Sequence, residues 1–177
     1  MLGRIKTLVF HPIDATTDFL SNVYKNKDYT IIRHIPSKSK IKKLIKEHDR
    51  IILLGHGTER GLLYNYIPHF YNHSIIGSEY IYLLKDKICI GIFCYASEFF
   101  KKYKLKGFAT GMFISDIDEA YYFNVSANNK ELTESNILIA NTINQYIDSD
   151  NMYQDVINMY NLDTSVCRFN RELIKQF

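Results

Sequence analysis

The sequence has few cysteines and no long run of apolar residues, and both features narrow the class of protein. Its 177 residues include three cysteines, Cys89, Cys94 and Cys167, without Cys-x-x-Cys spacing. An odd count without paired spacing favours neither a disulfide framework nor a four-thiolate zinc site, and it fits a reducing, intracellular setting. Because no apolar run approaches the roughly 20 residues that cross a bilayer, we expect no membrane-spanning segment.

Signals for secretion, nucleic-acid binding and nucleotide binding are also missing. Only the apolar residues 8–10 follow Arg4 and Lys6 before His11, whereas a secretory signal needs about 7–15 apolar residues. The formal net charge of +3 is too small to indicate nucleic acid. The sequence contains no phosphate-binding glycine-rich loop, repeat or Pro/Gly/Ser-rich linker. We therefore expect a single cytoplasmic domain over residues 1–177, with neither nucleic acid nor membrane as a partner.

An alternation of strand-like and helix-like segments runs along most of the chain. Strands are expected at residues 7–10, 29–35, 50–55, 87–93 and 107–114. Helices are expected between these strands and, in the C-terminal third, at residues 133–147, 150–160 and 165–177. This order predicts an α/β fold in which a mostly parallel sheet has helices on both faces.

Two reactive side chains follow the two most apolar of these strands. The strands at 50–55 and 87–93 are apolar at nearly every position, as expected for central strands covered on both faces. His56 follows the first and Cys94 follows the second. Ligands of parallel sheets gather at the carboxyl ends of the strands, and neighbouring strands lie ~4.8 Å apart. If these strands are neighbours, imidazole and thiol face one cleft.

A thiol and an imidazole in one cleft suggest acyl-transfer chemistry. The thiolate is the nucleophile, and a helix after Cys94 should favour the ionised form through its dipole. His56 can take the thiol proton and return it to a leaving amine. Gly57 has no Cβ, so a substrate carbonyl can approach, and its N–H together with that of Cys94 can hold a developing oxyanion.

Two short blocks carry a resemblance to a known family. IILLGHG at 51–57 and CIGIFCYAS at 89–97 resemble the corresponding blocks of caspase-like cysteine peptidases, the group that includes caspases, gingipains and legumains. The resemblance extends over about residues 7–114. It implies a caspase-like three-layer sandwich, with His56 and Cys94 as the catalytic pair and Gly57 at the oxyanion site. Phe93 stands where many members have Ala or a polar residue, and Ala96 stands where many members have Gly.

Three acidic residues, Asp116, Asp118 and Glu119, follow the strand after Cys94 and form an expected acidic turn. The resemblance implies that this region walls the pocket for the residue before the scissile bond. An acidic wall there would bind substrate and favour Arg or Lys. The same residues can also be solvated carboxylates of a surface turn.

The sequence thus predicts a caspase-like cysteine endopeptidase that acts on protein or peptide substrates and needs no metal or organic cofactor. A regulatory partner or self-association would control it, if it is controlled. One alternative is a catalytically inert α/β module that binds a protein or small ligand at the same strand edge. Another is a metal-dependent hydrolase using His69 and His73, which are spaced i, i+4.

Overall fold

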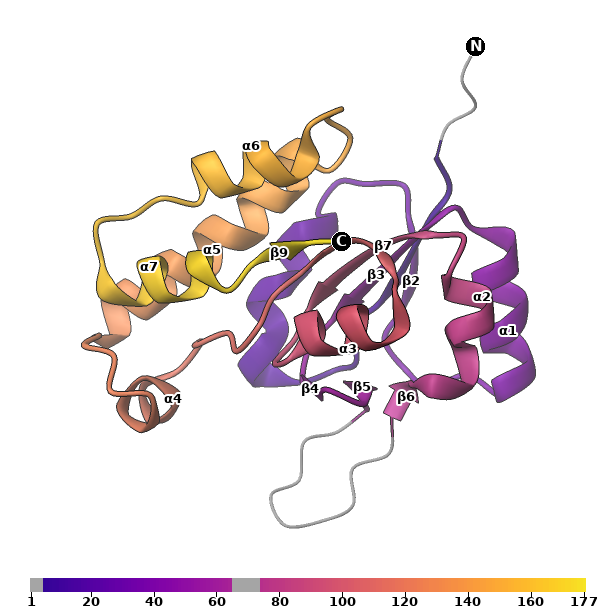
Figure 1. Cartoon of the computed structure of the whole chain (residues 1–177), viewed down its shortest axis with the longest axis horizontal. Coiled ribbons are helices and arrows are strands. Elements are labelled where there is room, and N and C mark those ends of the chain that lie inside the picture. The colour runs from indigo at the N-terminus through magenta and orange to yellow at the C-terminus, as the bar shows by residue number, and fades with distance from the viewer. Residues whose placement is uncertain (1–4, 65–73) are drawn as a thin grey trace.

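A computed structural model describes residues 5–64 and 74–177 of the chain (Figure 1). Its centre is a six-stranded sheet in the order β2-β1-β3-β7-β8-β9. The strands are β1 (Thr7–Phe10), β2 (Thr30–Ile32), β3 (Arg50–Leu54), β7 (Ile88–Ile92), β8 (Lys106–Ala109) and β9 (Lys175–Gln176). All neighbouring pairs are parallel except β8 and β9, which are antiparallel. The predicted α/β class and mostly parallel sheet are confirmed.

Helices cover both faces of this sheet and make three layers (Figure 1). One face carries α1 (Lys38–Glu47), α2 (Ile81–Leu84) and α3 (Ala96–Tyr103), and the other carries the 3₁₀ helix η1 (Ala15–Tyr24) and α5 (Asn129–Tyr146). On the α5 side, α6 (Met152–Met159) and α7 (Ser165–Glu172) add Val156 and Cys167 to the same core, while α4 (Ile117–Tyr122) lies farther from the sheet. None of the described helices is both long and apolar enough to cross a membrane.

The central strands are apolar because both faces of the sheet are buried. In β3, Ile51 and Leu53 pack into the core beneath α1 and α3, whereas Ile52 and Leu54 pack into the core with α5. All four side chains are fully buried, and each contributes about 1.5–3 kcal/mol by leaving water. The prediction that β3 is a central strand is confirmed.

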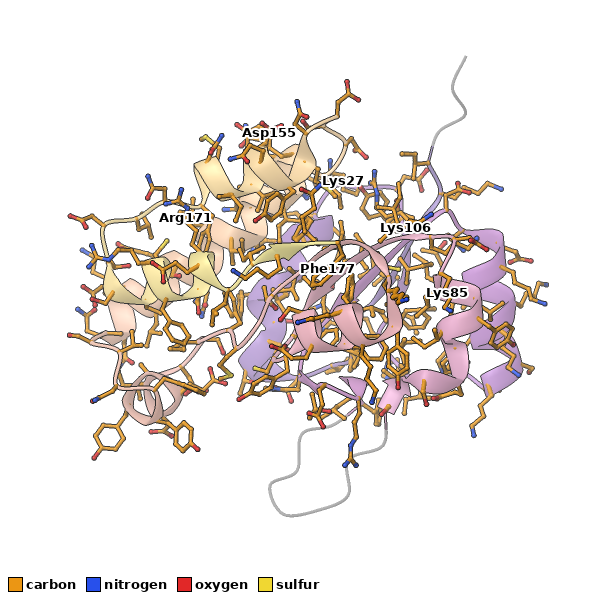
Figure 2. All side chains as sticks on the ribbon, in the orientation of Figure 1. Lys27, Lys85, Lys106, Asp155, Arg171 and Phe177 are labelled. Atoms are coloured by element: carbon orange, nitrogen blue, oxygen red, sulfur yellow. The ribbon has the colours of Figure 1, made fainter. Side chains whose placement is uncertain are left out.

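Surface and core are separated as the periodicity of the helices predicts. Ile41 and Ile45 of α1 are buried, while the lysines of this helix lie in solvent. Lys85, at the end of α2, also lies on the outside, and Arg171 and Asp155 lie on the outer helices (Figure 2).

The end of the chain differs from the prediction. The sequence predicts one helix over residues 165–177, but α7 ends at Glu172 and β9 adds an antiparallel strand to β8. Gly107 and Phe177 exchange backbone hydrogen bonds of 3.1 and 2.8 Å, which supply partners for the outer edge of β8. The Phe177 ring lies against Phe100 of α3, with 5.8 Å between the ring centroids.

Other expected boundaries shift for local reasons. Strands β2 and β8 are shorter than predicted, and β8 stops at Ala109. Helix α5 begins at Asn129 rather than after Thr133, because Asn128 and Glu131 form a reciprocal capping box.

A second, three-stranded antiparallel sheet occupies part of the stretch between β3 and α2, where the sequence predicts no strand. It consists of β4 (Gly57–Thr58), β5 (Gly61–Leu63) and β6 (Ser74–Ile76). It lies at the carboxyl edge of the main sheet (Figure 1). A short 3₁₀ turn, η2 (Ser78–Tyr80), then leads into α2. Gly57 and Thr58 of this small sheet form one wall of a cleft at that edge.

Candidate active site

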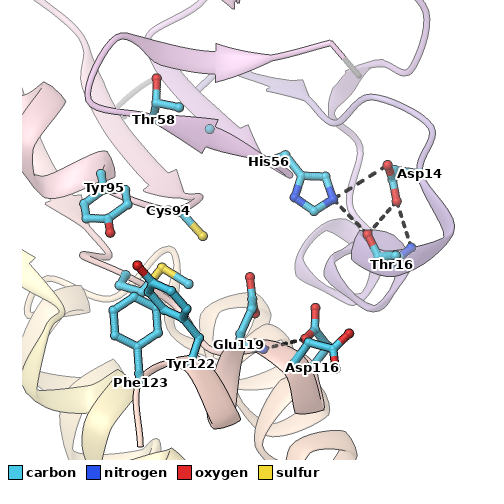
Figure 3. Close-up of a pocket in the computed structure, with 13 residues that line it drawn as sticks. Asp14, Thr16, His56, Thr58, Cys94, Tyr95, Asp116, Glu119, Tyr122 and Phe123 are labelled. Carbon is cyan, nitrogen blue, oxygen red and sulfur yellow. Dashed lines mark hydrogen bonds and ion pairs between the residues drawn. The ribbon is translucent and has the colours of Figure 1, made fainter. Parts of the chain in front are cut away.

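The two reactive side chains lie on neighbouring strands and line one cleft. Strands β3 and β7 pair directly, with Leu54 opposite Ile92. Gly55 follows with a φ of +130°, a left-handed conformation that favours glycine, and the chain leaves the sheet there to present His56. Cys94 lies two residues after β7. Both line a cleft of about 650 Å³ (Figure 3).

Cys94 is half-buried, and its environment favours the neutral thiol. The S–H donates to the backbone carbonyl of Phe113, with sulfur and oxygen 3.9 Å apart. Burial raises the pKa of Cys94 to about 11, and the carboxylate of Glu119 adds to this shift. The expectation that the helix dipole favours the thiolate is therefore wrong. Helix α3 starts only at Ala96, and Tyr95 stands between them with a positive φ of 62°, so burial and the nearby carboxylates outweigh the helix.

His56 is held by residues at the start of η1, namely its N-cap Asp14 and its second residue Thr16. Its Nε2 atom lies 2.8 Å from Thr16 Oγ1 and 3.6 Å from Asp14 Oδ2. The other ring nitrogen lies on the side of the ring that faces Cys94 (Figure 3). Sequence reasoning treats Asp14 and Thr16 only as residues that can cap a helix. Their position directly after β1, at the carboxyl edge of the sheet, is the signal that would have placed them in the site.

Gly57 begins the second wall of the cleft, and the reason for a glycine differs from the one expected. A Cβ at this position would lie 2.1 Å from Cδ2 of Phe93, so its absence makes room for the Phe93 ring rather than for a substrate. Leu63 N–H donates to the carbonyl of His56, which makes Gly57 and Leu62 the non-hydrogen-bonded pair of β4 and β5. The Gly57 N–H consequently points away from β5. Its oxyanion role, with that of the Cys94 N–H, stays a prediction.

The acidic residues lie on the opposite side of the same cleft. Asp116, Asp118 and Glu119 all line it, and they form the first turn of α4 rather than a free turn. Asp116 Oδ1 caps the helix by accepting from Glu119 N–H at 2.9 Å, while Glu119 Oε2 accepts from the N–H and hydroxyl of Ser115. Glu119 points into the space near Cys94 and His56 (Figure 3), and burial raises its pKa.

Aromatic side chains complete the rim of the cleft. Tyr95, Tyr122 and Phe123 line it with Met112, and Tyr122 is 81% exposed. From the sequence, Tyr121, Tyr122 and Phe123 could either line a pocket or pack on the sheet. Tyr122 and Phe123 line the cleft, whereas Tyr121 is not among its lining residues and is 89% exposed. The lining therefore combines carboxylates with aromatic rings.

The two other cysteines lie away from this cleft. Cys89 and Cys167 are fully buried, as expected for structural cysteines. His69 and His73, the alternative metal ligands, fall outside the described residues. Over residues 5–64 and 74–177, no three His, Cys, Asp or Glu side chains are grouped in a way that could hold a metal ion.

Comparisons with known proteins give no family assignment. No protein-family model matches the chain, and no curated protein sequence matches it significantly.

Proposed function

We propose that this protein is a cysteine endopeptidase of the caspase-like kind, in which Cys94 is the nucleophile and His56 is the general base and acid. One observation carries the proposal: paired parallel strands β3 and β7 deliver a thiol and an imidazole to one solvent-reachable cleft. Such a pair has the parts that acyl transfer needs.

The neutral thiol determines the order of events. Because the pKa of Cys94 lies at about 11, the proton leaves as the attack occurs rather than beforehand. His56 takes the S–H proton, and sulfur bonds to the scissile carbonyl carbon. The carbonyl oxygen becomes an oxyanion held by the N–H groups of Gly57 and Cys94.

Two further steps complete the reaction. The tetrahedral intermediate collapses, the C–N bond breaks, and the leaving amine takes the proton from His56, which leaves a thioester on Cys94. His56 then removes a proton from water as the water oxygen attacks the thioester carbonyl. The carboxylic acid departs, and the proton returns to Cys94 sulfur.

The carboxylates and aromatic rings opposite Cys94 support a preference for a basic side chain before the scissile bond. Asp116, Asp118 and Glu119 supply negative charge, and Tyr122 supplies a ring face for a cation. Glu119→Gln is therefore expected to raise KM for an Arg peptide severalfold while leaving KM for an Asn peptide within about twofold. An equal change for both peptides would contradict this specificity. We further propose that the enzyme acts in the cytoplasm on proteins or peptides, under control of a partner or by self-association.

The test of the proposal is a panel of fluorogenic peptides with Arg, Lys, Asp or Asn before the reporter. Cleavage should be fastest for Arg and Lys, and both Cys94→Ala and His56→Gln should abolish it. His34→Gln is the matched control, because His34 is exposed and is not among the residues lining the cleft. Activity that persists in Cys94→Ala would refute the assignment.

A second function is favoured by one observation, the raised pKa of Cys94. A thiol held neutral beside carboxylates also suits an inert α/β module that binds a ligand at this edge. The two functions predict different effects of His56→Gln on the rate at which Cys94 is alkylated. If Cys94 is a nucleophile, His56→Gln slows its alkylation at neutral pH, whereas in a binding module this substitution leaves the rate unchanged.

A further inference from the structure

The contacts of Thr16 determine the direction of the hydrogen bond to His56. Thr16 Oγ1 lies 2.6 Å from Asp14 Oδ1 and 2.8 Å from His56 Nε2. A hydroxyl has one proton to donate, and a carboxylate can only accept. Burial alone would raise the pKa of Asp14, but the hydrogen bonds from Thr16 and the nearby His56 bring it below its usual value. Asp14 is thus ionised, and the Thr16 proton lies between Thr16 and Asp14.

This arrangement fixes the tautomer of His56. Because the Thr16 hydroxyl gives its proton to Asp14, its oxygen can only accept from His56, so Nε2 carries the hydrogen. The lone pair of the neutral ring is then on Nδ1, the nitrogen on the side facing Cys94 (Figure 3). Asp14 Oδ2, 3.6 Å from Nε2, is too far for a hydrogen bond but stabilises the imidazolium that forms when His56 gains the thiol proton.

The turn that carries both residues is itself anchored. Asp14 Oδ1 also accepts from Thr16 N–H at 2.8 Å and caps η1. His11, fully buried at the end of β1, contacts the carbonyl of Thr17 through Nε2 at 3.1 Å. A carbonyl only accepts, so His11 donates this hydrogen bond. The backbone around Thr16 is consequently fixed by Asp14 on its N-terminal side and by the His11 contact with Thr17 on its C-terminal side.

We propose that Thr16, backed by Asp14, is a positioning residue that orients His56 and keeps its Nδ1 atom unprotonated toward Cys94. The proposal rests on the proposed function for its effect on catalysis. Its structural part, the tautomer of His56, stands without a substrate. The two parts can therefore fail separately.

Kinetics of Thr16 and Asp14 variants on the Arg peptide test the catalytic part. Thr16→Val removes the acceptor and should lower kcat about tenfold with KM within about twofold, as expected for losing one hydrogen bond to a group that becomes charged. Thr16→Ser keeps the hydroxyl and should restore kcat. Thr133→Val is the matched control, since this exposed hydroxyl bonds only the Asn129 carbonyl among the described residues.

Asp14→Ala gives the most discriminating result. Without the carboxylate, the Thr16 hydroxyl is free to donate to Nε2, and the hydrogen of His56 moves to Nδ1, where it blocks proton transfer from Cys94. We expect kcat to fall about 10²-fold, the lower end of what general-base catalysis supplies. Removing that hydroxyl as well, in Asp14→Ala/Thr16→Val, should raise kcat above that of Asp14→Ala. A double variant as slow as Asp14→Ala, or slower, would overturn the proposal. Ser37→Ala, which removes the cap of α1, controls for the lost cap.

Nitrogen-15 NMR of the full chain with labelled histidine gives a readout independent of peptide cleavage. The His56 signals are assigned by their loss in His56→Gln. The expected spectrum at mildly alkaline pH shows hydrogen on Nε2 in the wild type and an added Nδ1–H form in Asp14→Ala. An Nδ1–H form in the wild type would refute the role of Thr16 even if the protein cleaves peptides. The expected tautomer without any cleavage would instead refute the peptidase function alone.

Discussion

Replacing Glu119 should make Cys94 more reactive. Burial and the Glu119 carboxylate, in that order, raise the pKa of the Cys94 thiol to about 11, so on the order of 0.1% of the thiol is ionised at pH 8. Glu119→Gln removes the negative charge but keeps an acceptor oxygen for Ser115. The pKa of Cys94 should fall, and each unit would raise the thiolate fraction tenfold. We expect alkylation to accelerate severalfold, up to about tenfold.

The assay is iodoacetamide alkylation between pH 7 and 11, followed by mass spectrometry of the Cys94 peptide. In the wild type the rate should climb through pH 9 to 11 without an earlier plateau, because the thiol loses its proton only near its raised pKa. Asp118→Asn should accelerate the reaction less than Glu119→Gln does, since Asp118 is not among the groups that shift this pKa. Glu134→Gln, on the exposed surface of α5, should leave the rate unchanged. A Glu119→Gln rate equal to or below the wild type would refute the electrostatic reasoning.

Three further predictions concern stability and can be checked by urea unfolding. Burial lowers the pKa of His11 from 6.5 to about 4, so the free energy of unfolding should fall by up to about 3 kcal/mol as the pH drops through this range, and His11→Asn should flatten that slope; an equal slope in the variant would contradict this. Gly57→Ala should cost about 1–3 kcal/mol, because its Cβ would lie 2.1 Å from the Phe93 ring; a neutral effect would show that the ring moves freely. Asn128→Ala should cost about 1 kcal/mol through loss of the capping box with Glu131, and an unchanged midpoint would remove the cap from the account.

The sequence predicts that His56 and Cys94 share one cleft because this placement follows from general rules of parallel sheets. Parallel strands end at one edge, and two fully apolar strands in succession favour adjacent central positions. The structure pairs β3 with β7 as this argument requires. The acidic residues reach the cleft for a similar reason, since they follow β8, the next strand in the sheet.

The parts of the site that the sequence does not predict depend on contacts between segments far apart in the chain. Asp14 and Thr16 look like ordinary capping residues locally, and they meet His56 only because β1 lies beside β3. The pKa of Cys94 likewise depends on burial and on Glu119, which comes from a different element. Neither the sequence spacing nor the helix after Cys94 contains this information.

Weak local sequence patterns explain where the predicted fold differs from the observed one. The apolar periodicity of residues 165–177 continues past Glu172, but pairing with the outer edge of β8 turns the last residues into β9. The two- and three-residue strands of the small sheet are too short for an alternating pattern to reveal them. In both cases tertiary pairing decides the backbone conformation.

Intact-mass analysis after treatment with an arginyl peptide acyloxymethyl ketone, which reacts with an activated catalytic thiol, tests the roles of Cys94 and His56 together. We expect a single adduct, located on Cys94, and loss of that adduct in folded His56→Gln protein. Labelling of Cys89 or Cys167 instead, or equal labelling of Cys94 without His56, would contradict these roles.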